Sequence, residues 1–476
     1  MFLKRSTSIR KVHLIGICGT AMASLAGMLK THGYEVTGSD QHIYPPMSTF
    51  LEQLGIELFE GFSEEHMQCS PDLVVIGNVV SRGNPEVEHT LNQRLHFASM
   101  SEVLKELFIR GKRSIVVAGT HGKTTTTSLL AWILEFAGLD PSFLIGGIAE
   151  NFGSSFKLGS GEFFVIEGDE YDTAFFDKGP KFLHYLPERV IFNNCEFDHA
   201  DIYADFDAVK VSFRRLINII PSRGQLIACW DDPVVRELCT KALCPIGSFG
   251  LSSNAHWSAR HVQFYETTTQ FEVLQEGVPW GHFEVPLAGG FNVKNCLAVA
   301  ACASSLGISS QTVAKGLLAF KNVKRRLEIV ADLHGITIFD DFAHHPTAIR
   351  ETLAAVRSRY PGSRIWAVFE PRSATSRRNV FQKEFSECFG SANQVVLCSL
   401  FAPEKLAPSE RLDVQQVVND LQRQGVEAEL WSSADEIARQ ITPRLRAGDK
   451  VVIMSNGGFD GIHQKLAAAI STSRNE

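Results

Sequence analysis

Short apolar runs alternate along this chain with segments of helical periodicity and with glycine-containing turns. Near the N-terminus, the runs Val12–Ile15 and Tyr34–Thr37 are typical of buried strands, and a helical pattern that reaches Lys30 lies between them. A further apolar run, Leu73–Gly77, predicts another strand of the same kind. Because strands that alternate with helices usually pair in parallel, this part of the chain predicts a Rossmann-like α/β unit.

The same alternation recurs in the middle and at the end of the chain. Apolar runs at Ile115–Ala118, Phe163–Ile166 and Val190–Phe192 predict three central strands, and the segment after Trp257 is rich in strand-forming residues. Four more strands are predicted towards the C-terminus, at Ile336–Phe339, Arg364–Phe369, Gln394–Cys398 and Lys450–Met454.

Chain length favours several domains rather than one. A chain of 476 residues exceeds the size at which one hydrophobic core keeps growing. The basic segment Lys321–Arg326 reads as a connection between the second and third groups of strands. We therefore predict an α/β protein of three domains: an N-terminal Rossmann-like unit at 1–109, a central phosphate-loop sheet at 110–330 and a C-terminal Rossmann-like unit at 331–476.

Composition and charge narrow the range of partners. The chain is 44% hydrophobic and 21% charged, with a net charge of −7 and no long basic block. This balance argues against a nucleic-acid partner or a membrane-surface partner, and no obligatory protein partner is evident. The ten cysteines include no C-x-x-C pair, which fits a reduced, cytoplasmic setting.

The segment that follows Ile115–Ala118 carries the strongest chemical signal. A predicted strand runs into the glycine-bracketed turn Gly119–Thr125, where backbone N–H groups and the positive end of a helix dipole can hold phosphate. Lys123 is placed to reach β- and γ-phosphate oxygens, and the Thr124 hydroxyl to hold Mg²⁺. The spacing departs from the usual motif at Val117, and a tight turn with a surface lysine is the alternative. The predicted phosphate contacts are Gly119, Thr120, His121, Gly122, Lys123, Thr124 and Thr125.

Acidic residues cluster after the next predicted strand. The segment Glu167–Asp172 places several carboxylates at the carboxyl edge of a parallel sheet, where a cation would relieve their repulsion. With Thr124, the carboxylates of Glu167, Asp169, Glu170 and Asp172 predict a Mg²⁺–triphosphate site. His199, which ends the neighbouring strand segment, is placed to hold a second divalent ion. A solvated acidic loop and a surface histidine are the alternatives.

Two further segments suit a nucleotide site. Asp341 and His344 precede Pro346 in a cluster of two acids and two histidines that suggests groups reaching across a cleft, although a capped helix start is an alternative. Arg326 supplies positive charge suited to a phosphoryl-transfer transition state, unless its segment is only a basic linker.

Paired amides further along the chain suit a purine. Asn292 and Asn295 lie three residues apart at a helix start, where their amides can hydrogen-bond adenine and Phe291 can stack on it. Capping of the helix by Asn292 is equally open.

The N-terminal turn is a second anion-binding candidate. Gly16–Met22 follows a strand but has Cys18 where a dinucleotide fingerprint needs its second glycine, which counts against an NAD-dependent oxidoreductase. Another diphosphate could still bind the N–H groups of the helix start, with Asp40 after the second strand nearby. A purely structural turn is the alternative.

Together these motifs resemble the Mur ligase family, whose members use ATP to form amide bonds in bacterial cell-wall synthesis. The resemblance covers essentially the whole chain and implies ATP and Mg²⁺ as cofactors. It implies catalytic roles for Lys123, Glu170, His199, Arg326 and His344, with a metal site of Thr124, Glu170 and His199. The implied ATP contacts beyond the phosphate loop are Asn292, Asn295, Arg326 and Asp341. The implied UDP-sugar contacts are Gly16, Cys18, Gly19, Thr20, Ala21, Met22, Asp40, Ser81 and Arg82.

The same resemblance bears on the substrates. Segments such as Tyr44–Thr49 and Arg82–Pro85 look like those of members that join a recycled murein tripeptide, L-Ala-γ-D-Glu-meso-diaminopimelate, to UDP-N-acetylmuramate through an acyl phosphate. Members that add L-alanine share the N-terminal turn and are the alternative, and a non-catalytic nucleotide sensor is a third reading. Candidate peptide contacts at the carboxyl edges of C-terminal strands are Arg372, Ser373 and Asn456.

Overall fold

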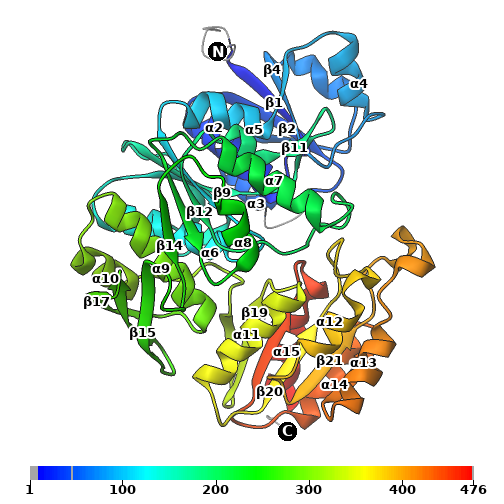
Figure 1. Ribbon diagram of the computed structural model, residues 1–476. Helices are drawn as coiled ribbons and strands as arrows, with labels where there is room; N and C mark the ends of the chain where they lie inside the picture. Colours follow the sequence, from blue (N-terminus) through cyan, green and yellow to red (C-terminus); the bar gives the residue numbers. More distant parts are fainter. Residues whose placement is uncertain (1–8, 44–46, 474–476) are drawn as a thin grey trace.

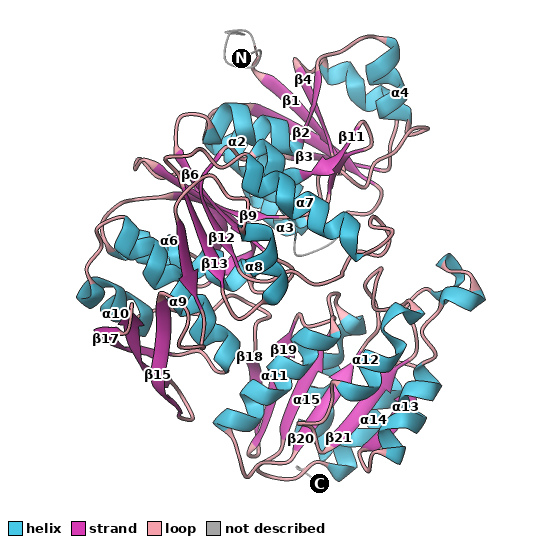
Figure 2. Ribbon diagram, in the orientation of Figure 1, coloured by secondary structure: helices cyan, strands magenta, loops and turns pink. Residues whose placement is uncertain are grey.

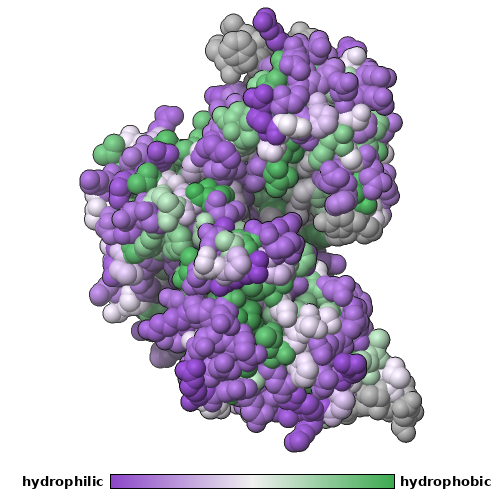
Figure 3. All heavy atoms as spheres, turned by 90° about the vertical axis from the view of Figure 1, so that its right-hand side faces the viewer, coloured by the Kyte–Doolittle hydropathy of each residue, from purple (hydrophilic) through white to green (hydrophobic). Residues whose placement is uncertain are grey.

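The computed structural model describes residues 9–43 and 47–473, which form three α/β units in chain order (Figures 1 and 2). The α/β class predicted from the sequence is confirmed. Residues 44–46, and with them the start of the segment Tyr44–Thr49, lie outside the described residues. Across the two described ranges, no helix is both long and apolar enough to cross a membrane. The face in Figure 3 is mostly hydrophilic, with only small hydrophobic areas between polar side chains.

Five parallel strands form the N-terminal sheet, in the order β3-β2-β1-β4-β5. The central strand β1 is buried from Val12 to Ile15 and leads directly into the Gly16–Met22 turn. The strands are β1 (Lys11–Ile15), β2 (Glu35–Asp40), β3 (Glu57–Glu60), β4 (Leu73–Ile76) and β5 (Phe97–Ser99). The helices are α2 (Thr20–Thr31), α3 (Met47–Gln53), α4 (Pro85–Asn92) and α5 (Met100–Val103).

A sheet of ten strands forms the central unit, in the order β17-β16-β15-β14-β13-β12-β6-β9-β7-β8. The strands are β6 (Arg113–Ala118), β7 (Ser142–Ala149), β8 (Ser154–Lys157), β9 (Phe163–Gly168), β12 (Pro187–Phe192), β13 (Gln225–Cys229), β14 (Ile246–Phe249), β15 (Trp257–Phe264), β16 (Thr269–Gln275) and β17 (Val278–Val285). Its helices are α6 (Lys123–Phe136), α7 (Phe206–Asn218), α8 (Pro233–Cys239), α9 (Gly290–Ser305) and α10 (Ser310–Leu318). Strands β10 (Asp172–Ala174) and β11 (Asp177–Pro180) form a separate hairpin. Because β12, β6 and β9 are adjacent and parallel, their carboxyl ends meet at one edge of the sheet.

The C-terminal sheet has six strands in the order β18-β19-β23-β20-β21-β22. Its strands are β18 (Glu328–Leu333), β19 (Ile336–Asp341), β20 (Ile365–Phe369), β21 (Gln394–Cys398), β22 (Glu427–Trp431) and β23 (Lys450–Met454). Its helices are α11 (Pro346–Arg359), α12 (Gln382–Glu387), α13 (Val414–Arg423), α14 (Ala434–Ile441) and α15 (Ile462–Ser473). Strand β18 pairs antiparallel with β19. The boundary predicted between residues 330 and 331 therefore falls inside β18, because this hairpin begins earlier than the apolar run that marks β19.

Both outer units contact the central one. In the first interface the Ser24 hydroxyl of α2 lies 2.7 Å from the hydroxyl of Ser155 in β8. In the second interface the backbone N–H of Ala200 donates to the Thr375 hydroxyl at 3.2 Å. In the same interface, Nε2 of His345, the residue before α11, lies 3.2 Å from the carbonyl oxygen of Phe197, which follows β12.

Candidate active site

The turn after β6 has the backbone shape of a phosphate cradle. Gly119 and Gly122 have φ values of +133° and +79°, in the left-handed region that favours glycine. Gly122 is the residue before α6, so the first N–H groups of that helix face the turn. The Lys123 ammonium folds back and donates to the carbonyl of Gly119 at 2.7 Å.

Two asparagines after β12 hold this turn from behind. Asn194 Oδ1 accepts the N–H of His121 at 2.7 Å, and its Nδ2 donates to the carbonyl of the same residue at 3.1 Å. Asn193 Nδ2 donates to the Thr126 hydroxyl at 3.1 Å. These supporting residues were not predicted as part of the site, although polar residues at the end of a buried strand next to the turn were a usable signal.

Lys123, Glu170 and His199 form one connected group. Lys123 Nζ lies 2.9 Å from Glu170 Oε2, and His199 Nε2 lies 3.2 Å from Glu170 Oε1. Burial acts to raise the pKa of Glu170, but the charge of Lys123 and the bond from His199 outweigh it and lower that pKa to about 2. Burial acts to lower the pKa of Lys123 and that of His199, but the neighbouring carboxylates outweigh it and raise both pKa values. The predicted grouping of Lys123, Glu170 and His199 is therefore present in space.

Glu167 belongs to the acidic cluster predicted to hold Mg²⁺, although it is not among the three predicted metal ligands. The Thr124 hydroxyl donates to Glu167 Oε2 at 3.0 Å, and the Gly146 N–H donates to Oε1 at 2.5 Å. Burial and the nearby charge of Asp169 raise the pKa of Glu167 to about 7. A carboxyl with this pKa gains from a neighbouring cation.

The donors around Thr124 suit a magnesium ion. Thr124, Glu167 and Glu170 offer hydroxyl and carboxylate oxygens, which are the ligands that Mg²⁺ prefers. His199 offers nitrogen, which suits a second ion of softer preference better than it suits Mg²⁺. The structure pairs Thr124 with Glu167, and Glu170 with His199, so the predicted ligands lie in two neighbouring pairs whose oxygen donors suit Mg²⁺.

A basic residue from the connection to the third unit reaches this site. Arg326 Nη2 donates to the Thr124 hydroxyl at 3.0 Å, and burial lowers the pKa of the guanidinium. Asp341, predicted as an ATP contact, is itself buried and accepts the N–H groups of Leu327 and Ala343 at 2.7 and 2.8 Å. In this arrangement Asp341 fixes the backbone that carries Arg326.

Histidines of the third unit face the end of β12. His344 Nε2 lies 3.8 Å from Asp198 Oδ2, and His199 Nε2 lies at the same distance from that oxygen. Although burial opposes it, the bond from His344 and the charge of His199 hold the pKa of Asp198 well below its usual range. The structure therefore brings the predicted His344 beside the predicted metal ligand.

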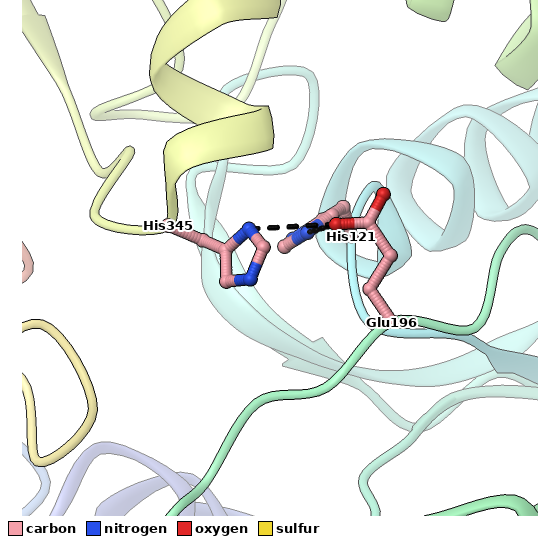
Figure 4. A group of neighbouring side chains, drawn as sticks. All are labelled: His121, Glu196 and His345. Carbon is pink, nitrogen blue, oxygen red and sulfur yellow. Dashed lines mark ion pairs between the residues drawn. The ribbon is translucent and has the colours of Figure 1, made fainter. Parts of the chain in front are cut away.

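His345 makes a separate contact with the phosphate-loop histidine and an acid (Figure 4). Its Nδ1 lies 3.5 Å from Glu196 Oε2, and His121 Nε2 lies 3.4 Å from that same oxygen. Burial and the neighbouring His121 lower the pKa of His345 to about 3. The Thr347 hydroxyl donates to Glu196 Oε2 at 2.7 Å.

The two predicted adenine contacts are buried close to the phosphate turn. Asn295 Nδ2 donates to Asn292 Oδ1 at 3.0 Å, and Asn292 Nδ2 donates to the carbonyl of Ala288 at 2.8 Å. Asn292 lies inside α9 and Gly289 precedes the helix, so the capping alternative for Asn292 is wrong. The backbone at the position before the helix has a φ of +89°, in the left-handed region, which explains why Gly289 occupies it.

The N-terminal turn is braced by the acid predicted beside it. Asp40 Oδ2 accepts the Cys18 N–H at 2.8 Å, and Gly16 has a φ of +82°. Gly19 precedes α2, which places the N–H groups from Thr20 to Met22 at the helix start. The predicted Ser81 and Arg82 follow β4, where the exposed Arg82 pairs with Glu88 at 2.9 Å.

Two of the three candidate peptide contacts lie together. The Arg372 side chain packs on the backbone of Gly457, next to Asn456, and its guanidinium lies 3.7 Å from the ring centre of Phe401. Asn456 Oδ1 is buried and has no hydrogen-bond partner among the described residues. Ser373 instead turns to Ser376, with 2.8 Å between the two hydroxyl oxygens.

Comparison with protein-family models covers nearly all of the chain. The model described as "Mur ligase family, catalytic domain" matches residues 11–112, the Mur ligase middle domain matches residues 117–303, and "Mur ligase, glutamate ligase domain" matches residues 325–457.

Similar proteins span the full length. A ligase of Escherichia coli (strain K12), named UDP-N-acetylmuramate–L-alanyl-γ-D-glutamyl-meso-2,6-diaminoheptandioate ligase, is 41% identical over 96% of this chain and 97% of its own. The UDP-N-acetylmuramate–L-alanine ligase of Alkaliphilus metalliredigens is 33% identical over 97% of each chain. The crystal structure of a murein peptide ligase from Psychrobacter arcticus matches with a TM-score of 0.73 and 37% identity, over 97% of this chain and 98% of the other.

Proposed function

The chain belongs to the Mur ligase family, and we propose that it joins UDP-N-acetylmuramate to the tripeptide L-Ala-γ-D-Glu-meso-diaminopimelate with conversion of ATP to ADP and phosphate. The observation that carries the proposal is the 41% identity, over nearly the whole of both chains, to a ligase named for these substrates. The 33% identity to an L-alanine-adding ligase makes L-alanine the second candidate amine.

The reaction has two chemical steps. A carboxylate oxygen of the muramoyl group attacks the γ-phosphorus of ATP, so that ADP leaves and an acyl phosphate forms. The free amine of the peptide then attacks the acyl carbon, loses a proton and displaces phosphate. Positioning and charge stabilisation supply most of the rate in such phosphoryl transfers.

The phosphate turn and its neighbours hold the triphosphate in this proposal. Backbone N–H groups at the start of α6 bind phosphate oxygens. The Lys123 ammonium leaves Glu170 and binds the β- and γ-phosphate oxygens instead. Thr124, Glu167 and Glu170 would hold Mg²⁺, which neutralises phosphate charge when it is bound. Asn295 lies beside the same turn, where its amide can hydrogen-bond the nucleotide.

The third unit completes the site. Arg326 is held next to Thr124, so its charge can stabilise the phosphoryl group as it is transferred. His344 approaches from the same unit towards Asp198, on the side where His199 lies. Contact between the units also excludes water that would hydrolyse the acyl phosphate.

The other two substrates occupy the outer units in this proposal. The UDP diphosphate binds the N–H groups at the start of α2, with Asp40 fixing the turn through Cys18. Arg372 and Asn456 contact the peptide from the carboxyl edge of the third sheet. The unpartnered carbonyl oxygen of the Asn456 side chain supports this role, because a buried polar atom gains from a ligand that donates to it.

The test is phosphate release by the purified protein with ATP, Mg²⁺ and UDP-N-acetylmuramate, with L-alanine and the tripeptide offered separately. Turnover with the tripeptide alone is expected, and the Lys123→Ala variant should be inactive with either amine. Turnover with L-alanine alone would refute the assignment of the amine substrate.

A further inference from the structure

Three side chains from separate segments converge where the third unit meets the central one (Figure 4). His121 comes from the phosphate turn, Glu196 follows β12, and His345 immediately precedes α11. One nitrogen of each imidazole and one Glu196 carboxylate oxygen all lie within 4.8 Å of one another. The group shares no residue with the Thr124, Glu167, Glu170 and His199 set described above.

The distances match those of a four-coordinate metal. Glu196 Oε2 lies 3.4 Å from His121 Nε2 and 3.5 Å from His345 Nδ1. A tetrahedral ion about 2.0–2.1 Å from each ligand requires neighbouring ligand atoms about 3.3 Å apart. The two oxygen–nitrogen distances lie within about 0.2 Å of this value, and the two imidazole nitrogens lie within 4.8 Å of each other.

The second nitrogen of His345 is held in the way that metal-bound histidines usually are. His345 Nε2 lies 3.2 Å from the carbonyl oxygen of Phe197. An N–H donated to that carbonyl leaves Nδ1 as the lone-pair atom. In this structure Nδ1 accepts the backbone N–H of Thr347 at 3.3 Å as the cap of α11 and lies 3.5 Å from Glu196 Oε2, so a bound ion would take the place of this cap bond. The Thr347 hydroxyl bonds the same carboxylate at 2.7 Å and fixes its orientation.

His121 adds an unpartnered atom to the group. Its Nε2 is buried, and within the described residues it makes no hydrogen bond, although Glu196 Oε2 is 3.4 Å away. The two imidazole rings lie with their centres 4.6 Å apart. A buried ring nitrogen without a hydrogen-bond partner gains from a metal ion placed between it and the acid.

We propose that His121, Glu196 and His345 form a binding site for a divalent transition-metal ion such as Zn²⁺, which ties the third unit to the central unit. Two imidazoles and one carboxylate are a donor set that Zn²⁺ accepts with a fourth position open to water. Mg²⁺ is not the expected occupant, because it prefers six oxygen ligands. Since His345 alone comes from the third unit, the ion holds the two units in contact.

The test uses Co²⁺ as a spectroscopic probe, titrated into the full-length protein without nucleotide and with Mg²⁺ in excess. Four-coordinate Co²⁺ absorbs visible light far more strongly than six-coordinate Co²⁺, so the parent protein should develop an intense band that Zn²⁺ abolishes. His345→Ala and Glu196→Gln should each weaken Co²⁺ binding by at least ~10–100-fold, the loss seen when even an outer-shell partner of a metal ligand is removed.

Two matched variants locate the ion. His344→Ala alters the adjacent residue of the same loop, and His199→Ala removes the histidine of the Glu170 group; both should keep the band. Glu196→Gln conserves shape, so its circular dichroism spectrum should match that of the parent. Absence of an intense band in the parent, an unchanged band in both His345→Ala and Glu196→Gln, or loss of the band in His199→Ala would each overturn the proposal.

Discussion

Replacing Gly122 with alanine tests whether the turn after β6 is the phosphate cradle. Gly122 has a φ of +79°, and an added Cβ would lie 3.0 Å from Asn295 Oδ1 and 3.1 Å from Asn193 Nδ2. Gly277, in the hairpin between β16 and β17, has the same φ of +79° but open space around an added Cβ. Gly277→Ala is therefore a control with equal backbone strain and no clash.

The structure separates the two contributions to the loss of stability. A left-handed alanine costs about 1–2 kcal/mol at either position. At Gly122 the added methyl also displaces two buried amides, one bonded to Thr126 at 3.1 Å and one to Asn292 at 3.0 Å. Each disturbed hydrogen bond costs about 1 kcal/mol. The totals are about 1–2 kcal/mol for Gly277→Ala and about 3–4 kcal/mol for Gly122→Ala.

Thermal unfolding and nucleotide titration measure these effects. At about 3 °C per kcal/mol for a unit of this size, Gly277→Ala should lower the unfolding midpoint by about 3–6 °C and Gly122→Ala by about 9–12 °C. Because Gly122 directly precedes the helix start that binds phosphate, Gly122→Ala should also weaken ATP binding by about tenfold or more, which corresponds to 1.4 kcal/mol. Equal midpoints for the two variants together with unchanged ATP affinity would refute the assignment of this turn.

Three further changes test other parts of the account. Lys123→Met should abolish turnover and destabilise the protein by about 3–5 kcal/mol, because it leaves the buried Glu170 carboxylate without its cation. Adding Glu170→Gln to this variant should restore part of the lost thermal midpoint. Additive losses of stability in the double variant would contradict the pairing of the two residues. Arg326→Ala should lower kcat by about 10²–10³-fold in a phosphate-release assay, and a parental kcat would remove this residue from the transition state. In the N-terminal unit, burial acts to lower the pKa of His13, but hydrogen bonds to Cys69 and Glu86 outweigh it and raise that pKa above 6.5. The stability that His13 contributes is therefore complete below pH 6.5 and is lost as pH rises through the raised pKa; thermal midpoints of parent and His13→Gln should converge above that range, and parallel pH curves would contradict the reasoning.

The segments that carry their own chemistry could be predicted from the sequence. The phosphate turn depends on the order strand, glycine, lysine and helix, which is contiguous along the chain. The acids after β9 were placed beside this turn because adjacent parallel strands end at one edge of a sheet. The contact between Lys123 and Glu170 follows from those two facts together.

Contacts between units could not be predicted in the same way. Glu196 and His345 are far apart along the chain and meet only because the third unit packs against the end of β12. The direction of Arg326, towards Thr124, depends on the same packing. Sequence pattern indicates which residues carry charge, but the relative placement of two folded units is decided by their whole interface.

The partners of individual side chains inside the site could not be predicted from the sequence either. Glu167 and Glu170 stand three residues apart with similar surroundings in the sequence, yet one binds Thr124 and the other binds Lys123. Their pKa values shift in opposite directions: burial and the charge of Asp169 raise the pKa of Glu167, whereas the direct contacts of Glu170 with Lys123 and His199 outweigh burial and lower its pKa. This difference depends on side-chain orientation, which strand periodicity does not determine.

The central claim is that the chain joins a muramoyl carboxylate to a peptide amine through an acyl phosphate. The most direct test supplies UDP-N-acetylmuramate with both carboxylate oxygens as ¹⁸O, together with ATP, Mg²⁺ and the tripeptide, and analyses the products by mass spectrometry. We expect an amide product that retains one ¹⁸O and released phosphate that carries the other. Unlabelled phosphate, or release of phosphate without an amide product, would contradict the central claim.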